Sequence, residues 1–279
     1  MIKKNDTSKI QQSVQVLSLD GQKQESIDLP NVFSTPFRPE VIQRVYNNLN
    51  SHVFQKQGRY PAAGQMVSAE SRNTGLGISR IARARGEGFP RSGQAAGVAS
   101  VRHGRLAHPP LSWKNIYKKI NRKEKLLAIC SAIAATTNSN LIRERGHVIS
   151  DAVDLPIVLS NDIENISKSK ELKQVLIKIG LVDDLYRGQK HRNKAIKRHK
   201  SNRRSPLSAI LIVSNDDKIG RLDNSIPGIS VKKLKDLSVL DLAPGSKPVR
   251  LTIFSKQAIE DLKEFKSTQN IAMELLNNQ

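Results

Sequence analysis

Residues 56–110, here called the long loop, carry nine basic side chains and nine glycines against two acids, Glu70 and Glu87. Eight of the nine cations are arginine, whose planar guanidinium forms paired hydrogen bonds with phosphate groups and base edges. Glycine between the arginines allows the backbone to approach a nucleic-acid surface closely, because no Cβ stands in the way. This combination predicts a segment that becomes ordered on a nucleic acid.

A second group of cations lies in residues 186–206, here called the basic segment, which contains nine lysines and arginines and no acid. Like charges without counter-ions repel one another, and phosphate relieves this repulsion while counter-ions are released. A solvated surface or a localisation tract is the alternative for this segment. Outside the long loop and the basic segment, 28 basic residues face 23 acidic ones. The net charge of +21 is therefore concentrated in two places.

Irregular RNA is the polyanion that this pattern favours, because close packing by shape and backbone suits glycine-spaced arginine. Aromatic residues make up only 4% of the chain, which argues against a base-stacking platform. The side chains that we expect to bind RNA are Lys56, Arg59, Arg72, Arg80, Arg83, Arg85, Arg91, Arg102, His103, Arg105 and His108 in the long loop, and Arg187, Lys190, Arg192, Lys194, Lys197, Arg198, Lys200, Arg203 and Arg204 in the basic segment.

No residue pattern indicates an active site, a metal or a cofactor. Gly75 and Gly77 resemble part of a dinucleotide-binding fingerprint, but the third glycine and a preceding strand are missing. Residues 215–217, Asn-Asp-Asp, follow an apolar run, where α/β proteins often place a metal or nucleotide site. The same triplet is an ordinary turn sequence. The histidines lack metal-ligand spacing, and Cys130 lies on an apolar helical face as a small buried side chain.

The chain of 279 residues is long enough to bury a sizeable core. It has no apolar run of membrane-spanning length, and its first residues lack the apolar segment of a signal peptide. A single cysteine excludes an internal disulfide and fits a reducing compartment. We therefore expect a cytoplasmic protein without a membrane partner.

Hydrophobic patterns predict the elements that must position these segments. Strands are expected near residues 13–20, 155–160, 207–213 and 249–254. Helices are expected at 40–54, after Asn121 with Glu124 as a capping box, at 171–179 and after Ser255. Strands separated by helices predict an α/β fold with a mostly parallel sheet and packed helices. The long loop should be extended and without regular secondary structure.

The expected domain organisation follows from these elements. Residues 13–55 and 111–268 form one discontinuous α/β globular domain, into which the loop 56–110 is inserted. The basic segment belongs to the globular part, and residues 1–12 and 269–279 are expected to be flexible ends.

Several strings resemble large-subunit ribosomal protein four in its archaeal and eukaryotic form. They are LPNVFSTPFRPEVI from residue 29, GLGISRIARARGEGFPRSGQAAGVASVRHGRLAHPP from residue 75, EKLLAICSAIAAT from residue 124, RGQKHR and SNRRSP in the basic segment, and LDLAPGSKPVRLTIF from residue 240. The likeness covers residues 14–266 in the same order. The lack of a long basic C-terminal extension favours the archaeal form.

The resemblance implies a structural protein of the large ribosomal subunit, not an enzyme, that binds large-subunit rRNA and aids its assembly. It implies that the long loop passes through rRNA to the nascent-peptide exit tunnel. Its tip would line the tunnel beside large-subunit protein twenty-two and the nascent polypeptide. The implied tip residues are Gly75, Gly77, Arg80, Arg83, Arg85, Gly86, Gly88 and Arg91.

Two other classes of protein compete with this interpretation. An RNA-modifying α/β enzyme could use the long loop to capture its substrate, with residues 215–217 as the only candidate site. A DNA-compacting protein would share the positive charge, but it would not need a large and nearly neutral domain. Neither class explains the spacing of glycine and arginine as well as an RNA-bound structural protein.

Overall fold

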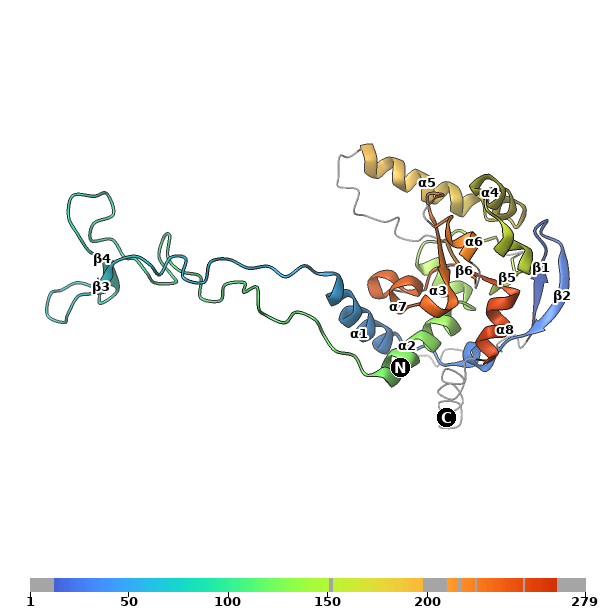
Figure 1. Cartoon of the computed structure of the whole chain (residues 1–279), viewed down its shortest axis with the longest axis horizontal. Coiled ribbons are helices and arrows are strands. Elements are labelled where there is room, and N and C mark those ends of the chain that lie inside the picture. The colour runs from blue at the N-terminus through green and yellow to red at the C-terminus, as the bar shows by residue number, and fades with distance from the viewer. Residues whose placement is uncertain are drawn as a thin grey trace, which may run out of the picture. The chain divides into compact units, whose positions relative to one another are not determined.

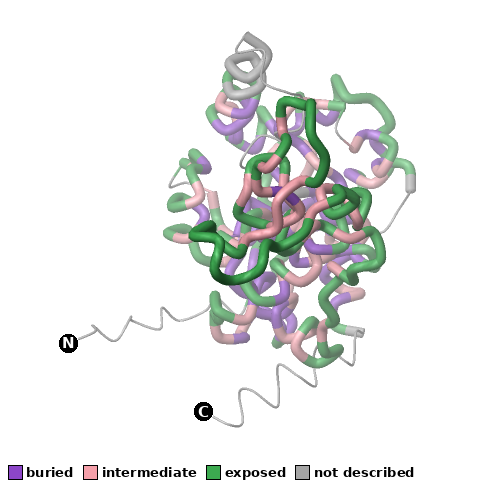
Figure 2. Tube along the Cα trace, turned by 90° about the vertical axis from the view of Figure 1, so that its left-hand side faces the viewer, coloured by how far each residue is buried: buried purple, intermediate pink, exposed green. Residues whose placement is uncertain are grey.

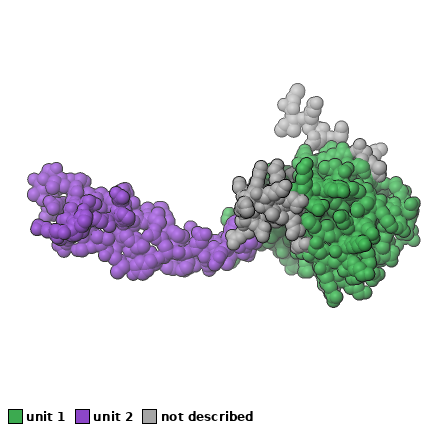
Figure 3. Space-filling view, turned by 90° about the horizontal axis from the view of Figure 1, so that it is seen from above, with its two compact units in different colours: residues 1–50, 118–279 green, residues 51–117 purple. Residues whose placement is uncertain are grey.

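The computed structural model describes residues 13–150, 153–197, 210–214, 217–223, 225–247 and 249–264; for residues 191–197, 211, 217 and 264 it describes the backbone alone. The chain divides into two compact units (Figure 3). The loop unit is Ser51–Tyr117, and the globular unit comprises the described residues on either side of it. The expected flexible ends, 1–12 and 269–279, lie outside the described residues.

A six-stranded sheet forms the centre of the globular unit, in the order β2-β1-β5-β8-β6-β7 (Figure 1). Its strands are β1 (Ser13–Leu17), β2 (Lys23–Asp28), β5 (Ile157–Leu159), β6 (Ile210–Ser214), β7 (Ile229–Lys233) and β8 (Thr252–Ser255). All neighbouring strands are parallel except β2, which is antiparallel to β1. The central strands read as continuous apolar runs because both faces of the sheet are covered. The predicted mostly parallel α/β fold is confirmed.

Helices cover this sheet and alternate with its strands along the chain (Figure 1). They are α1 (Pro39–Asn50), α2 (Arg122–Ala135), α3 (Ser139–Glu144), α4 (Ser169–Lys178), α5 (Val182–Lys197), α6 (Asp217–Gly220), α7 (Val239–Leu242) and α8 (Lys256–Glu264). Short 3-10 turns lie at Asn31–Ser34, Ser51–Val53, Asn161–Asn165, Leu234–Asp236 and Pro244–Ser246. Pro39 starts α1, since proline at the first helical position loses no intrahelical hydrogen bond.

Buried apolar residues between the sheet and the helices form one core (purple in Figure 2). Phe33 and Phe254 meet edge to face, with ring centroids 5.7 Å apart, and both are fully buried. Ser131 on α2 hydrogen-bonds to the segment that leads to α1. Its hydroxyl donates to the Pro36 carbonyl at 3.0 Å and accepts from the Arg38 N–H at 2.8 Å. The chain is therefore held between the 3-10 turn Asn31–Ser34 and the start of α1.

Three local predictions have different outcomes. Ser255 precedes α8 as expected, and its Oγ accepts a hydrogen bond from the Ala258 N–H at 3.1 Å. The capping box at the start of α2 is wrong. Asn121 makes no side-chain capping bond, and Glu124 accepts a bond from Arg44 Nη1 at 3.2 Å instead. Cys130 is fully buried, and its burial raises the pKa of the thiol to about 11.

Candidate nucleic-acid interface

The loop unit contains a small β-ladder that the sequence analysis did not predict. Strands β3 (Ala69–Ser71) and β4 (Ala82–Ala84) pair antiparallel. Residues 93–96 run along the other edge of β4, where the Ala84 N–H donates to the Gln94 carbonyl and the Ala96 N–H to the Ala82 carbonyl, both at 2.9 Å. Alanine side chains let these three segments lie close together. The rest of the long loop has no regular strand or helix among its described residues.

Two of the predicted RNA-binding arginines hydrogen-bond to carbonyl groups of the loop itself, and the bond of Arg83 crosses the ladder. Arg83 Nη1 donates to the Gly93 carbonyl at 3.0 Å, and Arg91 Nη2 donates to the Arg102 carbonyl at 3.3 Å. Both side chains are half-buried. They therefore hold the fold of the loop, and part of their hydrogen-bonding capacity is already used.

The outgoing and returning segments of the long loop, neither of which is a β-strand here, come into contact at Gly64 and Gly104. Gly64 has a φ of +83°, and a Cβ there would lie 2.7 Å from backbone atoms of Gly104 and Arg105. A Cβ at Gly104 would in turn collide with the Val98 carbonyl oxygen. Only glycine fits both positions, so part of the glycine content serves the loop's own packing.

Other predicted RNA-binding side chains are presented to solvent. These exposed residues are Lys56, Arg59, Arg72, Arg80, Arg85, Arg102, His103 and His108, whereas Arg105 is half-buried. Arg85 forms an ion pair with Glu70 across the ladder. Arg72 and Arg80 have no acidic partner within the described part of the chain. The glycines of the predicted tip, Gly75, Gly77, Gly86 and Gly88, all have positive φ values and form turns between these cations.

Apolar side chains of the loop unit are also exposed, a feature that the sequence analysis missed. Eleven of the fifteen exposed large hydrophobic residues in the described chain lie here: Val53, Phe54, Tyr60, Met66, Val67, Leu76, Ile78, Phe89, Leu106, Trp113 and Tyr117. A monomeric protein rarely leaves so many apolar groups uncovered unless they meet a partner.

The basic segment begins on α5, which packs closely on the globular unit. A Cβ at Gly188 would lie 3.3 Å from Gly228 Cα, so the helix sits against the turn before β7. Lys190 is exposed. Arg192, Lys194 and Lys197 lie on the same helix, and their side chains are not described. The predicted cations Arg198, Lys200, Arg203 and Arg204 lie outside the described residues.

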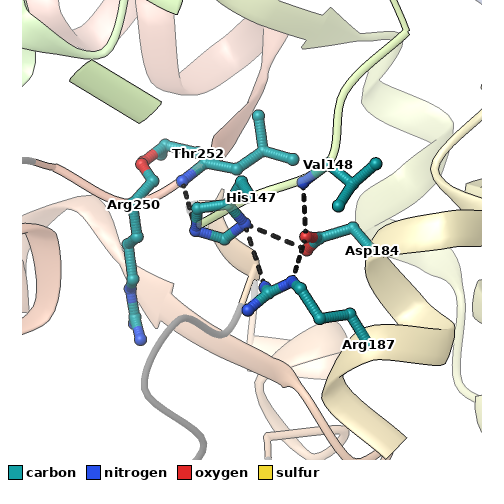
Figure 4. Close-up of polar contacts among 7 residues, drawn as sticks. His147, Val148, Asp184, Arg187, Arg250 and Thr252 are labelled. Atoms are coloured by element: carbon teal, nitrogen blue, oxygen red, sulfur yellow. Dashed lines mark hydrogen bonds and ion pairs between the residues drawn. The ribbon is translucent and has the colours of Figure 1, made fainter. Parts of the chain in front are cut away.

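Arg187, the first predicted cation of the basic segment, is bound to a buried carboxylate (Figure 4). Its Nε donates to Asp184 Oδ1 at 2.8 Å, and the Val148 N–H donates to the same oxygen at 3.1 Å. His147 Nδ1 lies 3.0 Å from Asp184 Oδ2. We call His147, Asp184 and Arg187 the buried triad. Sequence reasoning missed it because Asp184 lies just outside the acid-free segment.

The tautomer of His147 follows from its neighbours. The Leu251 N–H donates to His147 Nε2 at 3.1 Å, so that nitrogen must accept and the proton of the neutral ring is on Nδ1. Burial lowers the pKa of His147 more than the hydrogen bond to Asp184 raises it. Burial opposes ionisation of Asp184, but hydrogen bonds from His147 and Arg187 outweigh it and lower the pKa of the carboxyl. The triad thus links α5 to Leu251, the residue before β8, through a neutral histidine and an ionised aspartate.

Two further arginines of the globular unit are turned inward. Arg145 Nη2 donates to the Pro244 carbonyl at 2.8 Å, and Arg250 Nη2 donates to Ser230 Oγ at 2.6 Å. Burial lowers the pKa of each guanidinium to about 10. Arg145 thus binds the 3-10 turn Pro244–Ser246 and Arg250 binds strand β7, so both serve the fold of the globular unit.

The described residues show no group of His, Cys, Asp and Glu that could hold a metal ion. Of the alternative site at 215–217, Asn215 and Asp216 lie outside the described residues, and of Asp217 only the backbone is described. None of the described helices is long and apolar enough to cross a membrane. A cavity of about 310 Å³ lies between α4, α5 and the turn before β7, where Lys170, Lys173 and Gln189 line it.

Comparisons of the sequence with a family model and with known proteins all point to the same ribosomal protein family. Residues 27–265 match the model of the ribosomal protein L4/L1 family. The large ribosomal subunit protein uL4 of Sulfolobus acidocaldarius is 39% identical over 255 residues, which cover 90% of this chain and 94% of that protein. The protein of the same name from Saccharolobus islandicus is 37% identical over 253 residues, covering 89% and 93%. The Methanopyrus kandleri protein is 35% identical over 254 residues, covering 89% and 97%.

Proposed function

The chain belongs to the ribosomal protein L4/L1 family and is a structural component of the large ribosomal subunit, and from this premise we propose that it binds large-subunit rRNA mainly through its loop unit. One observation carries the proposal. The loop unit exposes arginines and apolar side chains together, and it has only two acids to neutralise the cations. An RNA surface supplies phosphate for the first group and base or sugar surface for the second.

Six of the eight arginines of the long loop fall into two groups with different roles. Arg83 and Arg91 hydrogen-bond to the loop's own carbonyls and hold its backbone, Arg83 across the ladder and Arg91 at Arg102. Arg59, Arg72, Arg80 and Arg102 extend into solvent and are free to bridge phosphates. The hydrogen-bonded backbone and the exposed guanidinium groups together form a surface that is ordered before RNA binds. Less conformational entropy is then lost on binding.

A salt titration tests this division. The double variant Arg72→Ala and Arg80→Ala should reduce the log–log salt dependence of binding to deproteinised large-subunit rRNA by about 0.7–0.9 per lost phosphate contact. Lys168→Ala is the control, because Lys168 is an exposed cation of the globular unit that already pairs with Glu171 at 3.3 Å. An unchanged slope for the double variant would contradict phosphate binding by these two arginines.

We further propose that residues 75–91 line the nascent-peptide exit tunnel and meet large-subunit protein twenty-two and the nascent polypeptide. The resemblance of this string to the family's loop supports the proposal, as does the exposure of Leu76, Ile78 and Phe89. Such apolar side chains at a turn-rich tip suit contact with a passing chain or a neighbouring protein better than contact with phosphate.

Deletion of residues 75–91 tests the tunnel role. The shortened protein should still enter large subunits, since the globular unit and the outer parts of the long loop remain. Subunits that carry it should show altered stalling on arrest-prone nascent peptides or altered sensitivity to tunnel-binding antibiotics. Normal incorporation with no change in either readout would contradict the tunnel assignment and leave rRNA binding intact.

The enzyme interpretation is not favoured. The similar proteins are named as ribosomal proteins, and no observation on the described residues supports a second function.

A further inference from the structure

We propose that residues 52–60 and 111–117 of the loop unit form a platform on which unpaired RNA bases stack. We call these two segments the aromatic stem. The inference rests on the proposed rRNA binding and adds a different kind of contact, to base faces instead of phosphates. It also revises the expectation, based on overall composition, that base stacking plays no part.

The two segments lie side by side and already contain one stack of rings. His52 and Tyr117 have ring centroids 5.4 Å apart and planes inclined by 25°. Lys56 Nζ lies 5.7 Å from the centroid of the same tyrosine ring. A Cβ at Gly58 would lie 3.0 Å from Ser112 Cβ, so the backbones are in close contact. The aromatic stem is therefore a defined surface within the loop unit.

Aromatic side chains of the stem face solvent. Phe54 is 56% exposed, Tyr60 62% and Trp113 67%. With Tyr117 they make four of the eleven aromatic residues in the whole chain, within two short segments. Aromatic groups are costly to leave in water, so this concentration indicates a surface that a partner covers.

The charges of the stem favour RNA as that partner. Each segment places a cation next to a ring: Arg59 precedes Tyr60, and Lys114 follows Trp113. Neither segment contains an acid. A nucleotide presents an apolar base face and a phosphate at neighbouring positions, so a ring beside a cation matches both groups. A protein partner would have to supply several carboxylates to match the same surface.

The mode of contact differs from that proposed for Arg72 and Arg80. A guanidinium bridges phosphates on any strand, paired or unpaired. A ring needs a base face, which a continuous duplex hides between its neighbours. The aromatic stem is thus expected to select unpaired nucleotides, with little preference among the four bases because each has a stacking face.

Trp113 is the only tryptophan of the chain, so its fluorescence reports on the stem alone. The full-length protein should be titrated with deproteinised large-subunit rRNA, with a short oligoadenylate and with an RNA duplex of the same length. The rRNA and the oligoadenylate should quench the Trp113 emission and protect it from acrylamide, whereas the duplex should bind without either effect. Equal quenching by the duplex would overturn selection of unpaired bases.

Affinity measurements with variants complete the test. Trp113→Ala should weaken rRNA binding by about fivefold or more, as expected for the loss of one base stack, and Trp113→Phe should recover most of the loss. Ile177→Ala removes another exposed apolar side chain, on α4 of the globular unit, and should leave the affinity unchanged. Unfolding of the globular unit should be the same in all three variants.

The possible failures are distinct. If the wild-type protein binds rRNA while Trp113 emission, acrylamide quenching and the affinity of Trp113→Ala all stay unchanged, base stacking is wrong and rRNA binding stands. If Trp113 then becomes protected only in assembled subunits, a protein covers the stem. If the wild-type protein does not bind rRNA at all, the proposed function and this inference are both overturned.

Discussion

Arginine has opposite roles in the two units of this protein. In the globular unit, Arg145, Arg187 and Arg250 turn inward and bond to a carbonyl, a buried carboxylate and a hydroxyl. In the loop unit, Arg72 and Arg80 extend into solvent on a backbone that other groups keep in shape. These three arginines stabilise the fold of the globular unit. Arg72 and Arg80 of the loop unit make no ion pair in the described chain and are the residues proposed to bind RNA.

Apolar side chains show the same difference. Ile212 and Phe254 are fully buried in the sheet, whereas Met66 and Trp113 are mostly in water. Burial of apolar surface is the main favourable term in folding. The globular unit therefore buries its own apolar side chains, whereas many of those in the loop unit stay exposed and would be covered by the proposed RNA. Variants that affect one unit and spare the other test this contrast.

The largest loss of folding stability is expected from a substitution in the buried triad. Asp184→Ala leaves His147 Nδ1, Arg187 Nε and the Val148 N–H without their acceptor, and it should lower the free energy of unfolding by about 3 kcal/mol or more. Asp183→Ala is the matched control, because its side chain is exposed on the same turn of α5. That variant should change stability by less than about 0.5 kcal/mol. Urea denaturation followed by far-UV circular dichroism measures both, and equal effects would contradict the structural role of the triad.

The pH dependence of stability should come from the same triad. The pKa of His147 is lowered in the folded protein, so between that pKa and the ordinary value of 6.5 the unfolded chain binds more protons. Stability should therefore fall as the pH drops below about 6.5. His147→Gln should be less stable at neutral pH and should lose less stability between pH 7 and 5. If the stability of the wild type and that of His147→Gln change in parallel with pH, groups other than His147 determine the pH dependence.

Asp184 adds a second pH effect at lower pH. Its pKa is lowered on folding, so its contribution is complete above the ordinary carboxyl range and is lost as the pH falls through the folded value. The loss from His147 should begin first on acidification, and that from Asp184 should follow. The Asp184→Ala profile should lack the second loss.

A smaller and local loss of stability is expected where the outgoing and returning parts of the long loop meet at Gly64 and Gly104. Gly64→Ala places a Cβ against the backbone of Gly104 and forces alanine into a left-handed conformation, which costs about 1–2 kcal/mol before any clash. Gly75→Ala has the same unfavourable φ sign but open space around its Cβ. Hydrogen exchange of residues 58–70 and 98–110 should accelerate in the first variant more than in the second. The globular unit should be unaffected in both.

The sequence predicted the parallel sheet because its central strands are continuous apolar runs, as in β6. It did not predict β2, whose exposed KQESID pattern lacks any apolar period and forms a strand only by pairing with β1. It missed β3 and β4 for a related reason. Strands of three residues have no measurable period, and their pairing depends on contacts that are far apart in the chain.

Charge counting predicted a nucleic-acid interface, but it could not separate exposed arginines from those that bond within the protein. Arg83 and Arg187 look like their neighbours in sequence, yet one bonds to a carbonyl across the ladder and the other to a carboxylate on its own helix. The aromatic stem was missed because a chain-wide percentage hides a local concentration. Trp113 and Tyr60 are far apart in sequence and belong to segments that only the fold brings together.

The smallest expected change in rRNA binding concerns the ion pair between Arg85 and Glu70 in the long loop, which would compete with the proposed RNA contact of Arg85. Arg85 Nη2 pairs with Glu70 Oε2 across the ladder, and both side chains are largely exposed. Such a pair contributes only about 0–1 kcal/mol to stability, so Glu70→Gln should leave the loop's hydrogen exchange nearly unchanged. It should release Arg85 to a phosphate and make the salt dependence of rRNA binding steeper by about 0.7–0.9.

Glu87→Gln separates this pairing effect from simple charge removal. Glu87 is the other acid of the long loop, it is exposed, and the described residues show no ion pair for it. Its neutralisation should raise the affinity slightly through the overall field, without an added phosphate contact and so with an unchanged slope. If the two variants give the same slope, release of Arg85 from Glu70 adds no phosphate contact, and Arg85 belongs with Arg83 and Arg91 among the arginines that hold the loop's own fold.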